Sequence, residues 1–280
     1  MREGVTDQER SIAALLTGDR LPMRETDYRD ENGVLRCRKC GHSVEKELWS
    51  GHFVRTSCQC EKIRQQEQEK RKQAEELERR RRVCFGAGGE KHYSETWEND
   101  SMPNESRKAR ATFDIMRKMS QHPEDHRFDS LKMVIIYGST GTGKSYIGAA
   151  SCNEALRNGR SARFTTVADL VAEYRNTRGD LIQFWEPLLN NWLIVLDDVF
   201  TEDASKSNVD FLFQLVEKRV GQRLIVTTNL SPERLKNIPQ YQRILSRFKD
   251  AHLEVNGDDI RTKDGTSKFA DVKEAIKEYA

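Results

Sequence analysis

A glycine-rich loop at residues 138–145, GSTGTGKS, constrains the fold of this chain more than any other sequence feature. It fits the phosphate-binding pattern G-x-x-x-x-G-K-[ST] at every fixed position. An apolar run at residues 132–137 precedes the loop, and an alanine-rich run at residues 146–156 follows it, which predicts a buried strand and then a helix. The loop therefore indicates a nucleotide-binding α/β domain with a parallel sheet flanked by helices.

The composition of the loop suits an anion. Its glycines let the backbone bend with N–H groups pointing inward, and the following helix adds the positive end of its dipole. Lys144 is expected to reach the β and γ phosphates of ATP, and Ser145 to ligate Mg2+. The predicted ATP-binding residues are Gly138, Ser139, Thr140, Gly141, Thr142, Gly143, Lys144 and Ser145.

Four cysteines form a C-x2-C and a C-x-C separated by seventeen residues: Cys37, Cys40, Cys58 and Cys60. This spacing predicts a closed tetrahedral Zn2+ site with a structural role. The segment around it has few apolar residues, so it would need the metal to fold. His42 and His52 are alternative ligands that could replace a cysteine.

Charge and hydropathy set further limits. Lys and Arg number 47 against 45 Asp and Glu, a net charge of +2, so the total alone does not indicate a nucleic-acid partner. We expect a cytoplasmic protein, because no export signal and no membrane-spanning apolar run are found. Residues 61–82 are almost wholly charged or Gln, which predicts a solvated helical spacer of ~33 Å, with a disordered linker as the alternative.

A second nucleotide-site motif lies farther along the chain. The apolar run at residues 191–196 predicts a central strand, and Asp197 and Asp198 follow it directly, as in a Walker B motif. Asp197 is expected to hold the Mg2+ shell and Asp198 to orient the attacking water as a base. Asn229 follows another predicted strand at residues 223–228 and could reach the γ phosphate, although a turn would explain it nearly as well.

Together these motifs resemble the AAA+ ATPases of the bacterial and phage helicase-loader family, typified by DnaC and DnaI. The resemblance covers residues 93–262 and includes VTTN at 226–229, RILSR at 243–247 and a later arginine. It implies that Asn229 is sensor 1, Arg247 is the arginine finger acting on a neighbour's ATP, and Arg261 is sensor 2. Arg243 is a weaker candidate for the finger. Asp198 stands where many AAA+ proteins have Glu, so slow hydrolysis stimulated by DNA or a partner is expected.

The sequence patterns together with the resemblance give a division of the chain, and the resemblance implies a function. The expected parts are an N-terminal region with the zinc-binding module, a charged helical linker with a glycine-rich hinge, the AAA+ ATPase domain and a C-terminal tail or helix, at residues 1–60, 61–92, 93–262 and 263–280. The expected function is an ATP-dependent helicase loader, with a DnaB-type replicative hexamer, single-stranded DNA and further copies of itself as partners during replication initiation.

Three other functions remain open from the sequence. An IstB-like ATPase helper of a DNA transposase has a very similar core, a small-molecule P-loop kinase shares the phosphate loop, and a zinc-based DNA-binding adaptor could carry an inactive ATPase. Single-stranded DNA is expected near the helix at residues 167–178, where Arg163, Tyr174, Arg175 and Arg178 would combine cations with one ring. The alternatives are a solvated helix face with Tyr174 in the core, or DNA contacts at residues 79–82.

Overall fold

The computed structural model describes residues 20–49, 52–99, 107–177, 181–200, 204–249 and 251–256. The chain divides into two compact units, Met1–Glu76 and Leu77–Ala280. The weakly apolar segment at residues 11–16, whose sequence supports at most one short helix, lies outside the described residues, as do the tail at 263–280 and Arg261. The finer domain boundaries drawn from the sequence stay a prediction.

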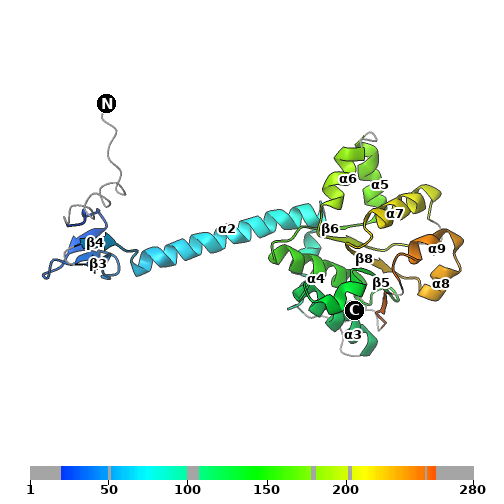
Figure 1. Cartoon of the computed structure of the whole chain (residues 1–280), viewed down its shortest axis with the longest axis horizontal. Helices are drawn as coiled ribbons and strands as arrows, with labels where there is room; N and C mark the ends of the chain where they lie inside the picture. The colour runs from blue at the N-terminus through cyan, green and yellow to red at the C-terminus, as the bar shows by residue number, and fades with distance from the viewer. Residues whose placement is uncertain are drawn as a thin grey trace, which may run out of the picture. The chain divides into compact units, whose positions relative to one another are not determined.

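The first unit contains two short antiparallel hairpins. Strand β1 (Asp27–Arg29) pairs with β2 (Leu35–Cys37), and β3 (Glu45–Trp49) pairs with β4 (His52–Arg55), as seen for the labelled β3 and β4 in Figure 1. Among the described residues of this unit, the buried apolar side chains are few: Leu21, Leu35, Cys37, Val44 and Cys58. Two of the five are cysteines, so apolar burial alone gives this unit very little stabilisation.

The charged segment is helical, as predicted. Helix α2 (Gln59–Phe85) ends where Gly86 takes a positive φ of 67°. Its last turns differ from the solvated spacer expected from composition, because Cys84 and Phe85 are buried and Leu77 packs against the same cluster. These apolar positions recur at helical spacing, so this end of the helix belongs to the core of the second unit.

The second unit is built on a five-stranded parallel sheet with the order β6-β7-β8-β5-β9. Its strands are β5 (Met133–Tyr137), β6 (Ala162–Thr165), β7 (Leu193–Leu196), β8 (Arg223–Thr228) and β9 (His252–Glu254). The predicted fold class is confirmed. Alternate side chains of one strand face opposite ways, so Ile135 joins one apolar cluster and Val134 the other.

Helices cover both faces of this sheet (Figure 1). The α-helices are α3 (Arg107–Gln121), α4 (Lys144–Arg157), α5 (Val167–Asn176), α6 (Leu181–Leu189), α7 (Lys206–Lys218), α8 (Pro232–Lys236) and α9 (Pro239–Leu245), and the 3-10 helices are η1 (Glu90–Ser94) and η2 (His126–Leu131). Helices α3 and α4 supply one cluster, and α5, α6, α7 and α9 supply the other.

Residues 240–250 have a helical sequence pattern, but the helix observed there is shorter. Helix α9 ends at Leu245, and Lys249 has a positive φ of 47°, which a helix cannot accommodate. Arg247 therefore lies in the turn after α9 rather than within a helix. Throughout the described ranges, every helix is too short or too polar to cross a lipid bilayer.

Candidate functional site

The glycine-rich loop connects β5 to α4 at the carboxyl edge of the sheet. Gly141 and Gly143 have positive φ values of 80° and 96°, conformations that other residues adopt only with strain. At Gly138 a side chain is excluded sterically, because a Cβ atom there would lie 1.9 Å from the carbonyl oxygen of Val255. The loop thus passes close to the end of β9, and α4 begins at Lys144 with its N–H groups directed at the loop.

Lys144 is 7% exposed and its ammonium group lies inside the curve of the loop. Its Nζ donates to the carbonyl oxygens of Gly138 at 2.9 Å and Ser139 at 2.6 Å. Thr142 Oγ1 also donates to the Ser139 carbonyl oxygen, at 2.9 Å. These bonds hold Lys144, the only cation among the described residues that line the cavity, at the centre of the predicted phosphate site.

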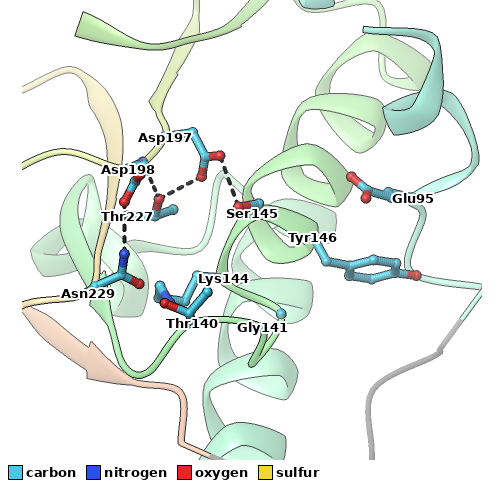
Figure 2. A pocket seen from close by; sticks show the side chains of 11 residues that line it. Glu95, Thr140, Gly141, Lys144, Ser145, Tyr146, Asp197, Asp198, Thr227 and Asn229 are labelled. Carbon is cyan, nitrogen blue, oxygen red and sulfur yellow. Dashed lines mark hydrogen bonds between the residues drawn. The ribbon is translucent and has the colours of Figure 1, made fainter. Parts of the chain in front are cut away.

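Asp197 follows β7 and faces the start of α4 (Figure 2). Its Oδ2 accepts a hydrogen bond from Ser145 Oγ at 2.9 Å, and its Oδ1 accepts one from Thr227 Oγ1 at 2.6 Å. The two residues predicted to share Mg2+, Ser145 and Asp197, are therefore adjacent although 52 positions separate them in the sequence. A hydroxyl and a carboxylate in contact are the oxygen donors that Mg2+ takes beside nucleotide phosphates.

Asp198 has a positive φ of 53°, which is unusual for a residue other than glycine. Its backbone N–H donates to Thr227 Oγ1 at 2.9 Å, and its Oδ1 accepts from Asn229 Nδ2 at 3.0 Å (Figure 2). The strained backbone is thus held by β8, and it aims the carboxylate at Asn229. The predicted base and the predicted sensor are in direct contact.

These groups line one cavity of about 380 Å³. Its walls include Glu95, Tyr146 and Thr227, which were absent from the residues predicted from the sequence. Thr227 did have a sequence signal, because it lies in the strand predicted at residues 223–228. In the structure Ile225 of β8 lies opposite Val195 of β7, so Thr227, two residues later, lies level with Asp197. Glu95 carried no such signal, because it comes from the irregular segment after η1.

The predicted arginine finger lies elsewhere. Arg247 is half-exposed, does not line this cavity, and pairs with Glu217 of α7 at 2.5 Å. Arg243 lies over the ring of Phe213, with its guanidinium carbon 4.4 Å from the ring centroid. Neither arginine contacts the phosphate site of its own chain, as a finger acting on a neighbouring subunit requires.

The structure describes three of the four residues of the predicted DNA-contact cluster around α5. The Tyr174 ring packs against Phe184 at 5.2 Å and Phe211 at 6.1 Å between ring centroids, so it belongs to the core. Arg163 pairs with Glu173 at 2.8 Å, whereas Arg175 is exposed. The ring of Tyr174 therefore packs as in the alternative of a helix face with this residue in the core. Arg178 lies outside the described residues, and DNA contact through the arginines stays a prediction.

The four cysteines form a second candidate site within the first unit. The Sγ atoms of Cys37, Cys40, Cys58 and Cys60 all lie within 4.8 Å of one another. A tetrahedral Zn–S distance of ~2.3 Å places sulfur atoms ~3.8 Å apart, so the cluster fits a zinc ion. Within the described ranges neither histidine belongs to the cluster: His42 is exposed, with its Nδ1 3.0 Å from the Cys40 carbonyl oxygen.

The crowded sulfur atoms influence one another's ionisation. Hydrogen bonds from the backbone N–H groups of Cys60 and His42 lower the pKa of Cys40 to about 5, which favours the thiolate that zinc requires. The hydrogen bond with Cys58, followed by burial, raises the pKa of Cys60 to about 12. Several thiolates cannot coexist here without a cation, so the donor set itself favours a metal.

Comparison with known proteins places the second unit among nucleotide-binding proteins. A family model described as "IstB-like ATP binding protein" matches residues 124–266, slightly more than half of the chain. This range includes the phosphate loop, both aspartates of the predicted Walker B motif and Asn229.

Individual relatives take part in the initiation of replication. Residues of this chain are 30% identical to the replicative helicase loader DnaC of Escherichia coli (strain K12) over 131 residues, 45% of this chain and 53% of that protein. The chromosomal replication initiator protein DnaA of Mesoplasma florum is 28% identical over 164 residues, 54% of this chain and 36% of that protein. The expected resemblance to helicase loaders is confirmed, although the match spans about half the length of these DnaC relatives.

Among solved structures, the crystal structure of the DnaC helicase loader superposes with a TM-score of 0.49 at 18% identity. The match covers 60% of this chain and 99% of that chain.

Proposed function

Since a family model matches more than half of its length, the chain belongs to the IstB-like ATP binding proteins, and we propose that it is an ATP-dependent loader of a replicative helicase. The observation that carries the ATPase part is the meeting of the phosphate loop, Asp197, Asp198 and Asn229 in one cavity. The 30% identity to DnaC supports the loader part.

In this proposal the loop residues bind the triphosphate of ATP. Lys144 turns from the carbonyl oxygens of Gly138 and Ser139 to compensate the β and γ phosphates. Ser145 and Asp197 hold Mg2+, since their oxygens already lie 2.9 Å apart. When bound, the magnesium ion neutralises the charge that develops on the phosphate oxygens.

Hydrolysis is assigned to the residues on the strand ends. Asp198 accepts a proton from the attacking water, and Asn229, which donates to Asp198 at 3.0 Å, orients the carboxylate and reaches the γ phosphate. An aspartate has a shorter arm than the glutamate found in many AAA+ proteins. A slow ATPase, stimulated by DNA or by the helicase, is the consequence.

We assign a further cation to a neighbouring copy of the chain. Charge spreads over the γ-phosphoryl oxygens in the transition state, and Lys144 is the one cation lining the described cavity. Arg247 is assigned as the arginine finger in trans, with Arg243 as the weaker candidate and Arg261 as sensor 2. This assignment requires self-assembly, which the separation of Arg247 from its own cavity supports.

The first unit is proposed to bind zinc through its four cysteines and to hold the helicase. The ligand set is closed, so the metal has a structural role and no open position for a catalytic water. Single-stranded DNA is assigned to the assembled ATPase units, with α5 no longer favoured as the contact because Tyr174 is in the core.

A second candidate is an ATPase helper of a DNA transposase, which the IstB-like family model also fits. The cysteine module favours the loader, because such a module suits an adaptor that grips a separate protein. The DnaC similarity points the same way.

Loading of a helicase tests the proposal directly. The purified full-length chain is mixed with candidate hexameric helicases and circular single-stranded DNA, and helicase retained on the circles is measured with and without ATP. ATP-dependent loading is expected, and Lys144→Ala should abolish it together with ATP binding. A chain that binds ATP but stimulates DNA strand transfer with a transposase, and loads no helicase, would overturn the loader function.

A further inference from the structure

One wall of the nucleotide cavity carries a negative charge that the phosphates of ATP do not explain. Glu95 lines the same cavity as Lys144 and Ser145, and its side chain is one-quarter exposed. A carboxylate repels phosphate groups at close range. Figure 2 shows Glu95 on the side of Tyr146, away from Asp198 and Asn229.

The carboxylate is fixed in place by its own segment. Its Oε2 accepts a hydrogen bond from His92 Nδ1 at 2.5 Å. The His92 ring is buried against Phe85 and Phe164, with ring centroids 5.6 Å and 4.6 Å away. Because the imidazole cannot swing, the glutamate that it holds keeps one orientation.

The backbone beside Glu95 is held equally firmly by α4. Asn153 is 1% exposed, and its Nδ2 donates to the carbonyl oxygens of His92 and Glu95, each at 2.8 Å. Its Oδ1 accepts from Arg81 Nε at 3.0 Å. The amide thus joins the end of α2 and the Glu95 segment to the helix that starts at the phosphate loop.

Tyr146 closes the same wall. Its hydroxyl donates to the carbonyl oxygen of Thr96 at 2.5 Å and also contacts that of Asn99. Tyr146 directly follows Ser145, so the cavity continues from the phosphate site towards Glu95 along one turn of α4.

From these contacts we propose that Glu95 is a specificity-determining residue that accepts a hydrogen bond from the nucleoside of the bound nucleotide. The inference rests on the proposed binding of ATP. The part of the ligand that can lie beside a fixed carboxylate is uncharged and carries N–H or O–H donors. In ATP the donors tested here are the 6-amino group of adenine and the 2′-hydroxyl group of the ribose, whereas guanine presents an acceptor oxygen at the 6 position.

The test compares nucleotide affinities in the full-length chain by isothermal titration calorimetry. ATP, GTP and 2′-deoxy-ATP are titrated into the unmutated protein, Glu95→Gln and a matched control, Glu98→Gln. Glu98 lies in the same segment, pairs with Arg157 at 2.7 Å and does not line the cavity. Both substitutions remove one negative charge and keep the size of the side chain.

Glu95→Gln is expected to lose about tenfold of the preference for ATP over GTP, or over 2′-deoxy-ATP, because a charge-assisted hydrogen bond is lost. A fall in the ratio of ATP affinity to GTP affinity identifies the 6-amino group as the donor. A fall in the ratio of ATP affinity to 2′-deoxy-ATP affinity identifies the ribose 2′-hydroxyl group. Glu98→Gln should leave both ratios unchanged.

Two results would overturn the inference, and they are distinguishable. If all three proteins bind ATP with both ratios equal, Glu95 does not read the nucleoside although the nucleotide site stands. If the unmutated protein binds no nucleotide, the proposed ATP binding fails first. Equal melting temperatures of the two variants exclude a folding defect as the cause of a changed ratio.

Discussion

The two compact units of this chain are stabilised in opposite ways. The second unit buries apolar side chains on both faces of a parallel sheet, and strand residues such as Ile135, Val195 and Val226 are fully buried. Each such side chain contributes roughly 1.5–3 kcal/mol. The first unit has one small cluster, in which two of the five buried side chains are the cysteines Cys37 and Cys58.

The comparison shows where each unit can change without unfolding. In the second unit the polar residues of the nucleotide cavity stand at the sheet edge, outside the two apolar clusters, so they serve function more than stability. In the first unit the same cysteines fill the core and offer the metal ligands. We therefore expect folding and metal binding to be coupled in this unit.

Removing the metal should have the largest effect. Structural zinc contributes roughly 10–16 kcal/mol of binding free energy, which becomes folding free energy in a small module. A chelator or Cys58→Ser should unfold the first unit while the second stays folded, as measured by hydrogen exchange of β2 against β5. Metal analysis should give one zinc per chain before treatment. Cys84→Ser is the control, because Cys84 is buried in the second unit and should leave the metal content unchanged. A first unit that stays protected without metal would contradict the comparison.

Arg247→Ala should lower ATP hydrolysis by about 10^3–10^5-fold, the usual contribution of an arginine finger, with ATP affinity unchanged. The fold should persist, because Arg247 makes an exposed ion pair with Glu217. Steady-state hydrolysis and nucleotide titration measure the two effects.

Mixing Arg247→Ala with Lys144→Ala should restore part of the activity, since one interface then combines an intact phosphate loop with an intact arginine. Arg243→Ala, which removes a guanidinium stacked on Phe213, is mixed with Lys144→Ala in the same way to test the weaker candidate. A mixed oligomer as inactive as either variant would place the action of Arg247 within its own chain.

Asp198→Asn should slow hydrolysis by about 10^2–10^4-fold, because the general base is lost while the hydrogen bond with Asn229 can persist. Asp197→Ala should instead abolish Mg2+-dependent hydrolysis, since its two oxygens contact Ser145 and Thr227. Magnesium titrations at fixed ATP separate these effects. Unchanged turnover in Asp198→Asn would move the base to another residue.

Gly138→Ala should lower the free energy of unfolding by about 2–4 kcal/mol, because its Cβ would overlap the carbonyl oxygen of Val255. Gly221→Ala is the matched control: its φ is 80°, but a Cβ there meets no atom within 4 Å. Only the backbone strain of ~1–2 kcal/mol applies to the control. Equal destabilisation in urea titrations would show that close approach is not the constraint at Gly138.

Much of the second unit was predictable because its signals are local. The strand before the phosphate loop, the strand before Asp197 and the strand before Asn229 each follow from consecutive residues, and all three are confirmed as elements of the sheet. The contacts of Tyr174 were not predictable in the same way. A tyrosine on an amphipathic helix can face a core or a ligand, and only the neighbouring Phe184 and Phe211 decide between them.

The sequence by itself determined the phosphate loop, its lysine and the cysteine cluster, because these depend on glycine conformations and ligand spacings within short segments. Only the tertiary structure decided that Thr227 bridges Asp197 and Asp198, and that Glu95 forms a wall of the cavity. The physical reason is distance along the chain. Glu95 reaches the site through hydrogen bonds from His92 and from Asn153, which lies 58 positions away, and no local pattern encodes such a meeting.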